Sequence, residues 1–391
     1  MDIFVTGIGA ISCIGMNVEE HLSSLVQEKS GIKKGERPFS TRFLVGEIPL
    51  TNEAIVAKYN LVADYSRTSL LGCIAASEAF ANHKRDKRIR TGLISGTSVG
   101  GMDISEVEYK SYLNLGQHNI QKYKAHSSGN SSEEIAAFLG IGDFVNTIST
   151  ACSSAANAIM MGARMIQQGV LDRVVVGGTD ALTEFTISGF RSLMIFDDQW
   201  CRPFDETRKG LNLGEGAGYI VLESQASIDK SGAKKLAKLK GWSNASDAYH
   251  QTASSPNGYG ATLSIQEALK VAKLQPSDID YINAHGTATP NNDLSESQAI
   301  INVFGDQIPA FSSTKAFTGH TLAAAGGIEA VISVLAIQNN TLFANLNHSH
   351  VIEETKLQPV VRTTKVDKIR NVLSNSFGFG GNNSTVIFGE V

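Results

Sequence analysis

The chain carries one order of local elements twice, and this repeat constrains its fold more than any other feature. The first set is "LISGTSVG", then "ISTACSSAANAI", then "VVVGGTDAL"; the second is "INAHGTATP", then "SSTKAFTGHTLAAAGGIEAVI", then "VLSNSFGFGG". Each set reads as a strand ending in small residues, a Ser-Thr turn that enters a helix, and a strand followed by or containing glycines. The repeat predicts two fused copies of one α/β unit, although such short matches leave chance similarity as the alternative.

Strand-like and helix-like segments alternate along the chain, which predicts an α/β fold with largely buried sheets. Runs such as "DIFVTGIG" and "RVVVGGTDAL" favour strands, whereas "SLLGCIAASEAFANH" and "TLAAAGGIEAVISVLAIQNN" favour helices. The two copies meet around residues 223–232. We therefore predict an N-terminal half at residues 1–230 and a C-terminal half at residues 231–391.

The first copy contains extra polar sequence between Met102 and Glu134. Long insertions in compact folds usually form lids, binding loops or interface segments. We expect one of these three roles for this insertion.

Composition excludes several classes of protein. The net charge of −4 argues against nucleic acid as a partner, since such binders are usually basic. No uncharged apolar run of about 18 residues appears, so no membrane span is expected, and the start of the chain does not resemble a signal peptide. The 4 cysteines are widely scattered, which fits neither a disulfide framework nor a metal site. We expect a cytoplasmic protein without a metal.

One cysteine, Cys152, lies where a strand-like run gives way to a helix-like run. A thiol at that junction is near the positive end of the helix dipole, which favours the thiolate. Nucleophilic cysteines are often placed in this way. The alternative is a small buried side chain, which is the usual role of a free cysteine.

The second copy supplies two histidines at corresponding positions. His285 directly follows a hydrophobic strand, and His320 stands at the entrance of a helix. Lys315 precedes His320 by five residues, and Glu329 lies within the helix that follows. If the two copies face each other, the matching junctions bring Cys152 and the two histidines to one site. The other histidines are interpreted as ordinary core or surface residues.

Five motifs together resemble the β-ketoacyl-acyl carrier protein synthases, the elongating condensing enzymes of the thiolase superfamily. They are "STACSSA", "RPFDETRKGLNLGEGAG", "NAHGTATPNND", "SSTKAFTGH" and "NSFGFGG", and they span most of the chain in the family's order. The resemblance implies the five-layered αβαβα thiolase fold, made of duplicated halves, in a homodimer. It also implies a decarboxylative Claisen condensation that joins an acyl-enzyme thioester to malonyl-acyl carrier protein, in fatty acid or polyketide and polyene elongation.

The resemblance assigns the reacting groups by position. Cys152 matches the nucleophile that accepts the acyl group, and His285 and His320 match the pair that assists decarboxylation. Two ring N–H groups would stabilise the enolate oxygen. The backbone N–H groups of Cys152 and Phe379 match the oxyanion hole, and Phe379 also matches a gatekeeper of the acyl pocket. Lys315 matches a lysine important for the site.

The resemblance also implies a carrier-protein partner. That partner supplies the phosphopantetheine arm, so no tightly bound cofactor is expected. The remaining matched residues are Thr287 and Thr289 for phosphopantetheine contact, and Asp293, Glu329 and Phe377 in supporting roles. Arg67 and Arg208 are candidates, by resemblance, for a basic docking rim.

Two residues depart from the family pattern. Leu211 stands where a phenylalanine is common, and Ser105 stands where some members place a large apolar residue in the acyl pocket. Together they predict a roomier, somewhat more polar pocket that accepts long, unsaturated or partly polar acyl chains. Alternatively, neighbours such as Met102 or Ile104 fill the space.

Four other interpretations remain to be compared. A thiolase needs a second cysteine near its C-terminus, but no cysteine follows Cys201. Initiating, coenzyme-A-using synthases pair their cysteine with His and Asn rather than with two histidines. A chain-length-factor-like partner subunit lacks the nucleophile, and Cys152 argues against it. A nicotinamide-binding protein would have a third glycine in "TGIGAIS", but Ser12 stands at that position, so we interpret this turn as structural.

Overall fold

The structure is a computed structural model that describes residues 1–117 and 119–391, so His118 lies outside the described residues. A 10-stranded mixed sheet runs through the molecule in the order β10-β9-β13-β14-β8-β1-β7-β6-β4-β5. The bounds of its strands are β1 Ile3–Ser12, β4 Thr91–Gly96, β5 Phe144–Ile148, β6 Arg173–Asp180, β7 Gly216–Ser224, β8 Ala237–Ser246, β9 Tyr281–Asn283, β10 Ala310–Ser312, β13 Asn371–Gly378 and β14 Asn382–Gly389.

The sheet consists of two halves with the same topology. One half runs β5-β4-β6-β7-β1 and the other runs β10-β9-β13-β14-β8. In both, the first three strands are parallel and the last two are antiparallel to their neighbours. The halves join through an antiparallel pairing of β1 with β8. The duplicated α/β unit predicted from the sequence is thus confirmed.

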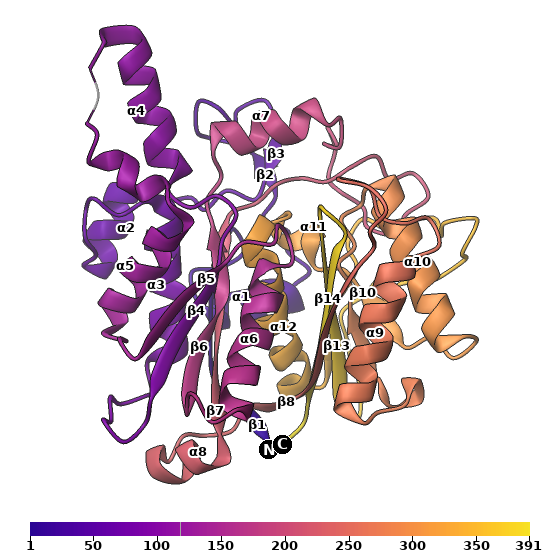
Figure 1. Ribbon diagram of the computed structural model, residues 1–391. Coiled ribbons are helices and arrows are strands. Elements are labelled where there is room, and N and C mark those ends of the chain that lie inside the picture. Colours follow the sequence, from indigo (N-terminus) through magenta and orange to yellow (C-terminus); the bar gives the residue numbers. More distant parts are fainter. Residues whose placement is uncertain (118) are drawn as a thin grey trace.

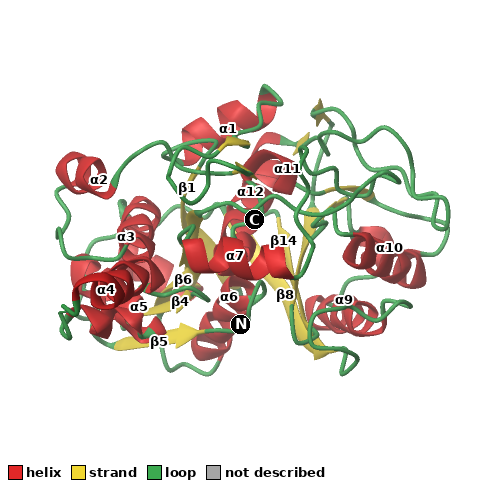
Figure 2. Ribbon diagram, turned by 90° about the horizontal axis from the view of Figure 1, so that it is seen from above, coloured by secondary structure: helices red, strands yellow, loops and turns green. Residues whose placement is uncertain are grey.

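Helices lie on both sides of each half-sheet, giving five layers (Figures 1 and 2). The central layer contains α6 and α12, one outer layer contains α3 and α5, and the other outer layer contains α9 and α10. Their bounds are α3 Arg67–Phe80, α5 Ser128–Leu139, α6 Ser154–Gln167, α9 Tyr259–Ala272, α10 Pro290–Phe304 and α12 Ala325–Asn339. This is the αβαβα architecture expected from the sequence.

The remaining elements connect these layers. The helices are α1 Val18–Val26, α2 Asn52–Tyr59, α4 Met102–Leu115, α7 Glu184–Ser192, α8 Gln225–Ser231 and α11 Lys315–Thr318, with 3-10 turns η1 Lys122–His126, η2 Pro276–Asp278 and η3 Leu322–Ala324. Two small sheets pair β2 Lys33–Lys34 with β3 Leu44–Val45, and β11 Thr341–Leu342 with β12 Thr364–Lys365. The predicted boundary between the N-terminal and C-terminal halves, at residue 230, falls within α8. This boundary stays a prediction.

The polar insertion of the first copy is mainly helical. It comprises α4, η1 and the first half of α5, and α4 projects from the body of the molecule (Figure 1). The described residues of the insertion therefore form a helical arm.

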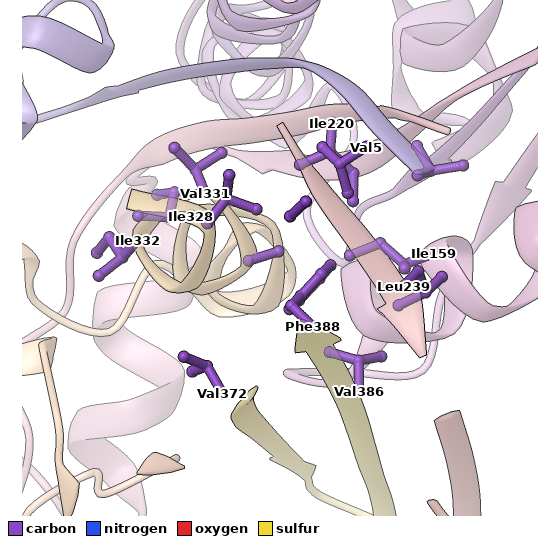
Figure 3. Packing of buried hydrophobic residues seen from close by; sticks show 14 of the residues in the cluster. Val5, Ile159, Ile220, Leu239, Ile328, Val331, Ile332, Val372, Val386 and Phe388 are labelled. Carbon is purple, nitrogen blue, oxygen red and sulfur yellow. The ribbon is translucent and has the colours of Figure 1, made fainter. Parts of the chain in front are cut away.

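The core of the molecule lies where the two halves meet. Ile159 of α6, Val331 of α12 and Ile220 of β7 pack in one buried cluster with Val372 and Phe388 of the second half (Figure 3). Burying each such side chain contributes about 1.5–3 kcal/mol. This shared cluster holds the two halves together.

Helix α12 owes its apolar composition to its place in this central layer. The segment Leu322–Asn339 is long and apolar enough to cross a membrane, but 89% of it is buried inside the protein. A helix surrounded by protein on all sides is apolar all round, as this one is. Its composition is explained by the core.

Two glycines allow α12 to approach the sheet closely. A Cβ atom built on Gly327 would lie 2.2 Å from the carbonyl oxygen of Gly218 in β7, and one built on Gly218 would lie 2.2 Å from the backbone nitrogen of Ile328. Backbone atoms cannot move aside as a side chain can. Helix and strand are therefore in direct backbone contact.

We predict that Gly327→Ala destabilises the protein by about 2 kcal/mol or more, because overpacking against backbone cannot relax. Urea unfolding followed by circular dichroism measures this. Gly189→Ala in α7 is the matched control, since a Cβ there has nothing within 4 Å. Alanine favours a helix over glycine by about 0.5–1 kcal/mol, so the control should be as stable as the parent or more so. Equal stability of the two variants would contradict the prediction.

Candidate active site

The structure brings Cys152, His285 and His320 to one cavity between the two halves. The cavity has a volume of about 300 Å³ and all three side chains line it. Cys152 comes from the first copy and both histidines come from the second. The juxtaposition predicted from the repeat is confirmed.

Cys152 lies on a tight turn that leads into α6. The preceding residue, Ala151, has a φ of 53°, which is unusual for a residue with a side chain and marks a constrained turn. The hydroxyl of Ser154 donates to the carbonyl of Ala151 at 2.6 Å and fixes the turn. The Cys152 Sγ therefore points into the cavity, 3.0 Å from the Nε2 atom of His320.

The protonation state of Cys152 differs from the expectation drawn from its helix-entry position. Burial raises the pKa of its thiol to about 12, although Lys315 and the backbone N–H of Phe379 lower it. The resting site thus holds a thiol rather than a thiolate, because desolvation outweighs the nearby positive charge and N–H groups. Removal of the proton needs a base, and His320 is within reach.

His320 is held by the backbone on both sides. Its N–H donates to the carbonyl of Asn212 at 2.8 Å, and its own carbonyl accepts from the N–H of Gly214 at 3.0 Å. Burial and the neighbouring Lys315 lower the pKa of His320 well below its usual value. The ring is therefore neutral near neutral pH and can accept the thiol proton.

His285 follows strand β9 and stands edge-on to His320, with ring centroids 5.4 Å apart and an interplanar angle of 86°. Burial, Lys315 and His320 all lower its pKa well below the usual value. The Lys315 ammonium lies 3.3 Å from Nδ1 of His285 and donates to the His285 carbonyl at 2.6 Å. An ammonium can only donate, so Nδ1 accepts and the ring proton resides on Nε2.

Lys315 and Glu329 form a buried ion pair beneath the two histidines. Burial raises the pKa of Glu329 to about 7, while Lys315 opposes that rise. Both side chains are almost fully buried, and the ion pair compensates the cost of burying the ammonium. This arrangement gives Lys315 a physical role, because the lysine fixes the tautomer of His285.

Two backbone N–H groups face the Cys152 sulfur. The N–H groups of Phe379 and of Cys152 itself both lower the pKa of the thiol. Gly378 permits this approach, because a Cβ there would lie 2.9 Å from the carbonyl oxygen of Thr150. The Phe379 ring stacks on that of Phe190, with centroids 5.7 Å apart, and both rings line the cavity.

The predicted phosphopantetheine residues and supporting residues lie around the histidines. The hydroxyls of Thr287 and Thr289 are 2.9 Å apart and both residues line the cavity. The Phe377 ring lies 5.7 Å from that of His285. Asp293 lies outside the cavity lining, where it accepts N–H groups of Phe204 and Ala288 at 2.7 and 3.1 Å. Asp293 thus holds the backbone of the loop that follows His285.

The two predicted acyl-pocket residues lie apart. Leu211 lines the cavity together with Phe190, Leu193 and Ile195, which gives one wall an apolar character. Ser105 is not among the lining residues; its hydroxyl donates to the Gly101 carbonyl at 3.2 Å and lies 3.0 Å from Nδ1 of His126. Its place along an acyl chain stays a prediction.

The prediction that Arg67 belongs to an exposed docking rim is wrong. Arg67 is 4% exposed and binds Glu215 through Nε and Nη2 at 2.9 and 2.7 Å, so it cannot steer a partner from solvent. Arg208 is half-buried and donates to the carbonyl of Pro290, which lines the cavity. Its docking role stays a prediction.

Two buried acids near the site were missed. Glu296 accepts the N–H groups of His285 and Gly286 at 2.9 and 2.8 Å, and Asp180 accepts those of Val99 and Ala323 at 3.0 and 2.9 Å. Burial raises the pKa of Glu296 to about 7 and raises that of Asp180. The sequence offers a signal for each of these acids. Asp180 ends the apolar strand "VVVGGTD", and Glu296 lies about one helical turn after Asp293.

Within residues 1–117 and 119–391, no cluster of three or more His, Cys, Asp or Glu side chains could hold a metal ion. The thiol of Cys152 and the imidazoles of His285 and His320 line the cavity.

Comparison with known proteins gives matches along the chain. Family models described as beta-ketoacyl synthase, N-terminal domain, and beta-ketoacyl synthase, C-terminal domain, match residues 1–227 and 236–349. A 3-oxoacyl-[acyl-carrier-protein] synthase 2 of Staphylococcus aureus is 33% identical over 404 residues, covering 99% of this chain and 97% of the relative. The protein of the same name from Coxiella burnetii is 34% identical over 412 residues, covering 100% and 98%.

Solved structures give the same picture. The ishigamide ketosynthase/chain length factor is similar with a TM-score of 0.93 and 30% identity, covering 100% of this chain and 99% of that one. A ketosynthase in complex with its chain length factor from Xenorhabdus doucetiae has a TM-score of 0.85 and 31% identity, covering 100% and 98%. A type II PKS acyl-carrier protein in complex with its ketosynthase is similar with a TM-score of 0.90 and 26% identity, covering 100% of this chain and 99% of that one.

We predict that alkylation of Cys152 by iodoacetamide accelerates about tenfold per pH unit from about pH 7 to about pH 10, without a plateau. Below a pKa of about 12 the thiolate fraction grows tenfold with each unit. Peptide mass mapping follows the Cys152 peptide specifically, and Cys152→Ser is the control for other cysteines. A rate that is flat across this range would reveal a resting thiolate–imidazolium pair and contradict the prediction.

Proposed function

The chain belongs to the β-ketoacyl synthase family, and on this premise we propose that Cys152, His285 and His320 carry out its condensation reaction. The family reaction is a decarboxylative Claisen condensation that yields 3-oxoacyl-acyl carrier protein. The observation that supports the assignment is the single cavity that all three side chains line. A non-catalytic partner subunit would not need a thiol within 3.0 Å of an imidazole.

In the first half-reaction, the Cys152 sulfur attacks the acyl thioester of a carrier protein. His320 takes the thiol proton through Nε2 and delivers it to the departing phosphopantetheine sulfur. The oxyanion of the tetrahedral intermediate is bound by the backbone N–H groups of Cys152 and Phe379. The products are the acyl-enzyme thioester and the free carrier thiol.

In the second half-reaction, malonyl-carrier protein enters the same cavity and loses carbon dioxide. Its thioester oxygen becomes an enolate oxygen, which binds the Nε2–H of His285 and the ring N–H of His320 after that ring has exchanged to the Nε2–H tautomer. The carbanion attacks the acyl carbon on Cys152 and expels the sulfur as a thiolate, which takes up one proton from solvent and returns to the resting thiol. The new carbon–carbon bond gives the 3-oxoacyl product on the carrier.

The carrier protein is the proposed partner, and its phosphopantetheine arm takes the place of a resident cofactor. Five polar residues line the cavity, namely Thr252, Ser254, Thr287, Thr289 and Asn291. A polar entrance suits the amides of the arm, whereas the wall with Leu211 suits hydrocarbon. We propose an apolar, long or unsaturated acyl chain, and the lining residues give less support to a partly polar one.

We propose a homodimer, in which the free edge of β5 and the helix α4 meet a second copy. Strand β5 ends the sheet, and an unpaired edge offers N–H and C=O groups to another strand. On α4, Val107, Leu113 and Leu115 are 61–69% exposed, an unusual load of apolar surface for one helix. A heterodimer with a chain length factor is the alternative, because two similar structures contain one.

Sedimentation of the purified chain tests this assembly. We expect a dimer at micromolar concentration with no other protein present. A monomer that dimerises only when a chain length factor is added would contradict the homodimer.

We place the protein in the cytoplasm. Four cysteines, Cys13, Cys73, Cys152 and Cys201, are free, and a reducing compartment keeps thiols in that state.

Decarboxylation separates the two catalytic roles and tests the proposed function. Cys152→Gln should still decarboxylate malonyl-carrier protein, because its amide mimics the acyl thioester in the oxyanion hole. Adding His320→Ala should slow carbon dioxide release at least about 100-fold, since an enolate donor is lost. His350→Ala in the Cys152→Gln background is the matched control, because His350 is exposed. Equal rates for the two double variants would refute the role of His320.

A further inference from the structure

Three asparagines outside the catalytic set form a hydrogen-bonded group beside the nucleophile turn. We call Asn157, Asn244 and Asn382 the asparagine cluster. Asn382 Oδ1 accepts from Nδ2 of Asn157 at 2.9 Å and from Nδ2 of Asn244 at 2.7 Å, and Asn244 Nδ2 also lies 3.1 Å from Asn157 Oδ1. The members come from α6, β8 and β14, so the cluster joins three elements.

The cluster contacts the turn that carries Cys152. Asn157 Nδ2 donates to the Thr150 hydroxyl at 2.8 Å, and the Ser153 hydroxyl lies 2.7 Å from Asn382 Oδ1. These two residues flank the Ala151–Cys152 pair. The position of the Cys152 N–H therefore depends on side chains that also bind Asn382.

The cluster also contacts the turn that carries Phe379. Asn382 is the first residue of β14 and directly follows Gly380 and Gly381, which have φ values of 83° and 76°. Glycines with positive φ are easily displaced, because no side chain restricts their backbone. A side-chain anchor immediately after them limits that freedom. Asn382 supplies such an anchor, tied to the opposite turn.

We infer that the asparagine cluster fixes the spacing of the Cys152 and Phe379 N–H groups, with Asn382 as the positioning residue of the oxyanion hole. This inference rests on the proposed function, in which both N–H groups bind the oxyanion. It adds residues that touch neither substrate nor reacting atoms. A donor displaced by a few tenths of an ångström loses much of its effect, because oxyanion stabilisation depends on preorganised geometry.

The test compares Asn382→Val with Asn382→Thr, which have the same shape and differ in one polar oxygen. Transfer of an acyl group from acyl-carrier protein to Cys152 is followed in a single turnover by peptide mass mapping. We expect Val to slow transfer about tenfold and Thr to stay within about threefold of the parent. Asn302→Ala is the control, because Asn302 of α10 donates to Asn257 and Thr262 far from the site.

Decarboxylation distinguishes positioning from general damage. In the Cys152→Gln background, Asn382→Val should slow carbon dioxide release much less than it slows acyl transfer, because the enolate oxygen binds His285 and His320, whereas the oxyanion hole only holds the introduced glutamine amide in this reaction. Parent-like acyl transfer in the Val variant, equal slowing by Val and Thr, or equal loss of both partial reactions would each overturn the inference.

A second variant covers the case in which Asn382→Val does not fold. Asn157→Ala removes a donor to Asn382 and places a strong helix former in α6. It should slow acyl transfer several-fold, and a parent-like rate would overturn the inference. If the parent itself is not acylated at Cys152, the proposed function fails first, which is a different result.

Discussion

Direct backbone contact between helix α12 and strand β7 sets the distance between the two halves of the molecule. Gly327 and Gly218 make that contact possible, and no side chain separates helix from sheet there. His320 and Lys315 precede α12, whereas Cys152 precedes α6 in the same central layer. The 3.0 Å separation of thiol and imidazole therefore depends on how closely these two helices are held between the sheets.

Burial explains the electrostatics of the site. Burial in the protein keeps the Cys152 thiol protonated and both imidazoles neutral. Beside His285, the opposite charges of Lys315 and Glu329 form an ion pair and neutralise each other. A neutral imidazole has one donor and one acceptor, so the lysine can fix which nitrogen of His285 carries the proton. Desolvation thus sets the protonation states of the site, and the ion pair holds the lysine that fixes the tautomer of His285.

Backbone groups form part of the site together with side chains. The Phe379 N–H reaches the sulfur because Gly378 allows β13 to approach the nucleophile turn. Glu296 holds the N–H groups of His285 and Gly286, and Asp180 joins the loop at Val99 to Ala323 beyond His320. These acids act on backbone orientation. Their roles are hard to find in the sequence because many of their partners are main-chain N–H groups, and their side-chain partners Asn375, Thr97 and Ser98 lie far away along the chain.

The sequence by itself determined the duplicated α/β unit, the pairing of Cys152 with two histidines, and the family, because strand and helix periods and ordered motifs are local properties. Only the tertiary structure decided the protonation of Cys152, the burial of Arg67 against Glu215 and the position of Ser105 outside the cavity. Burial and partners arise when distant segments meet. A pKa or an exposed charge is therefore a property of the assembled fold and cannot be assigned to a residue from its neighbours along the chain.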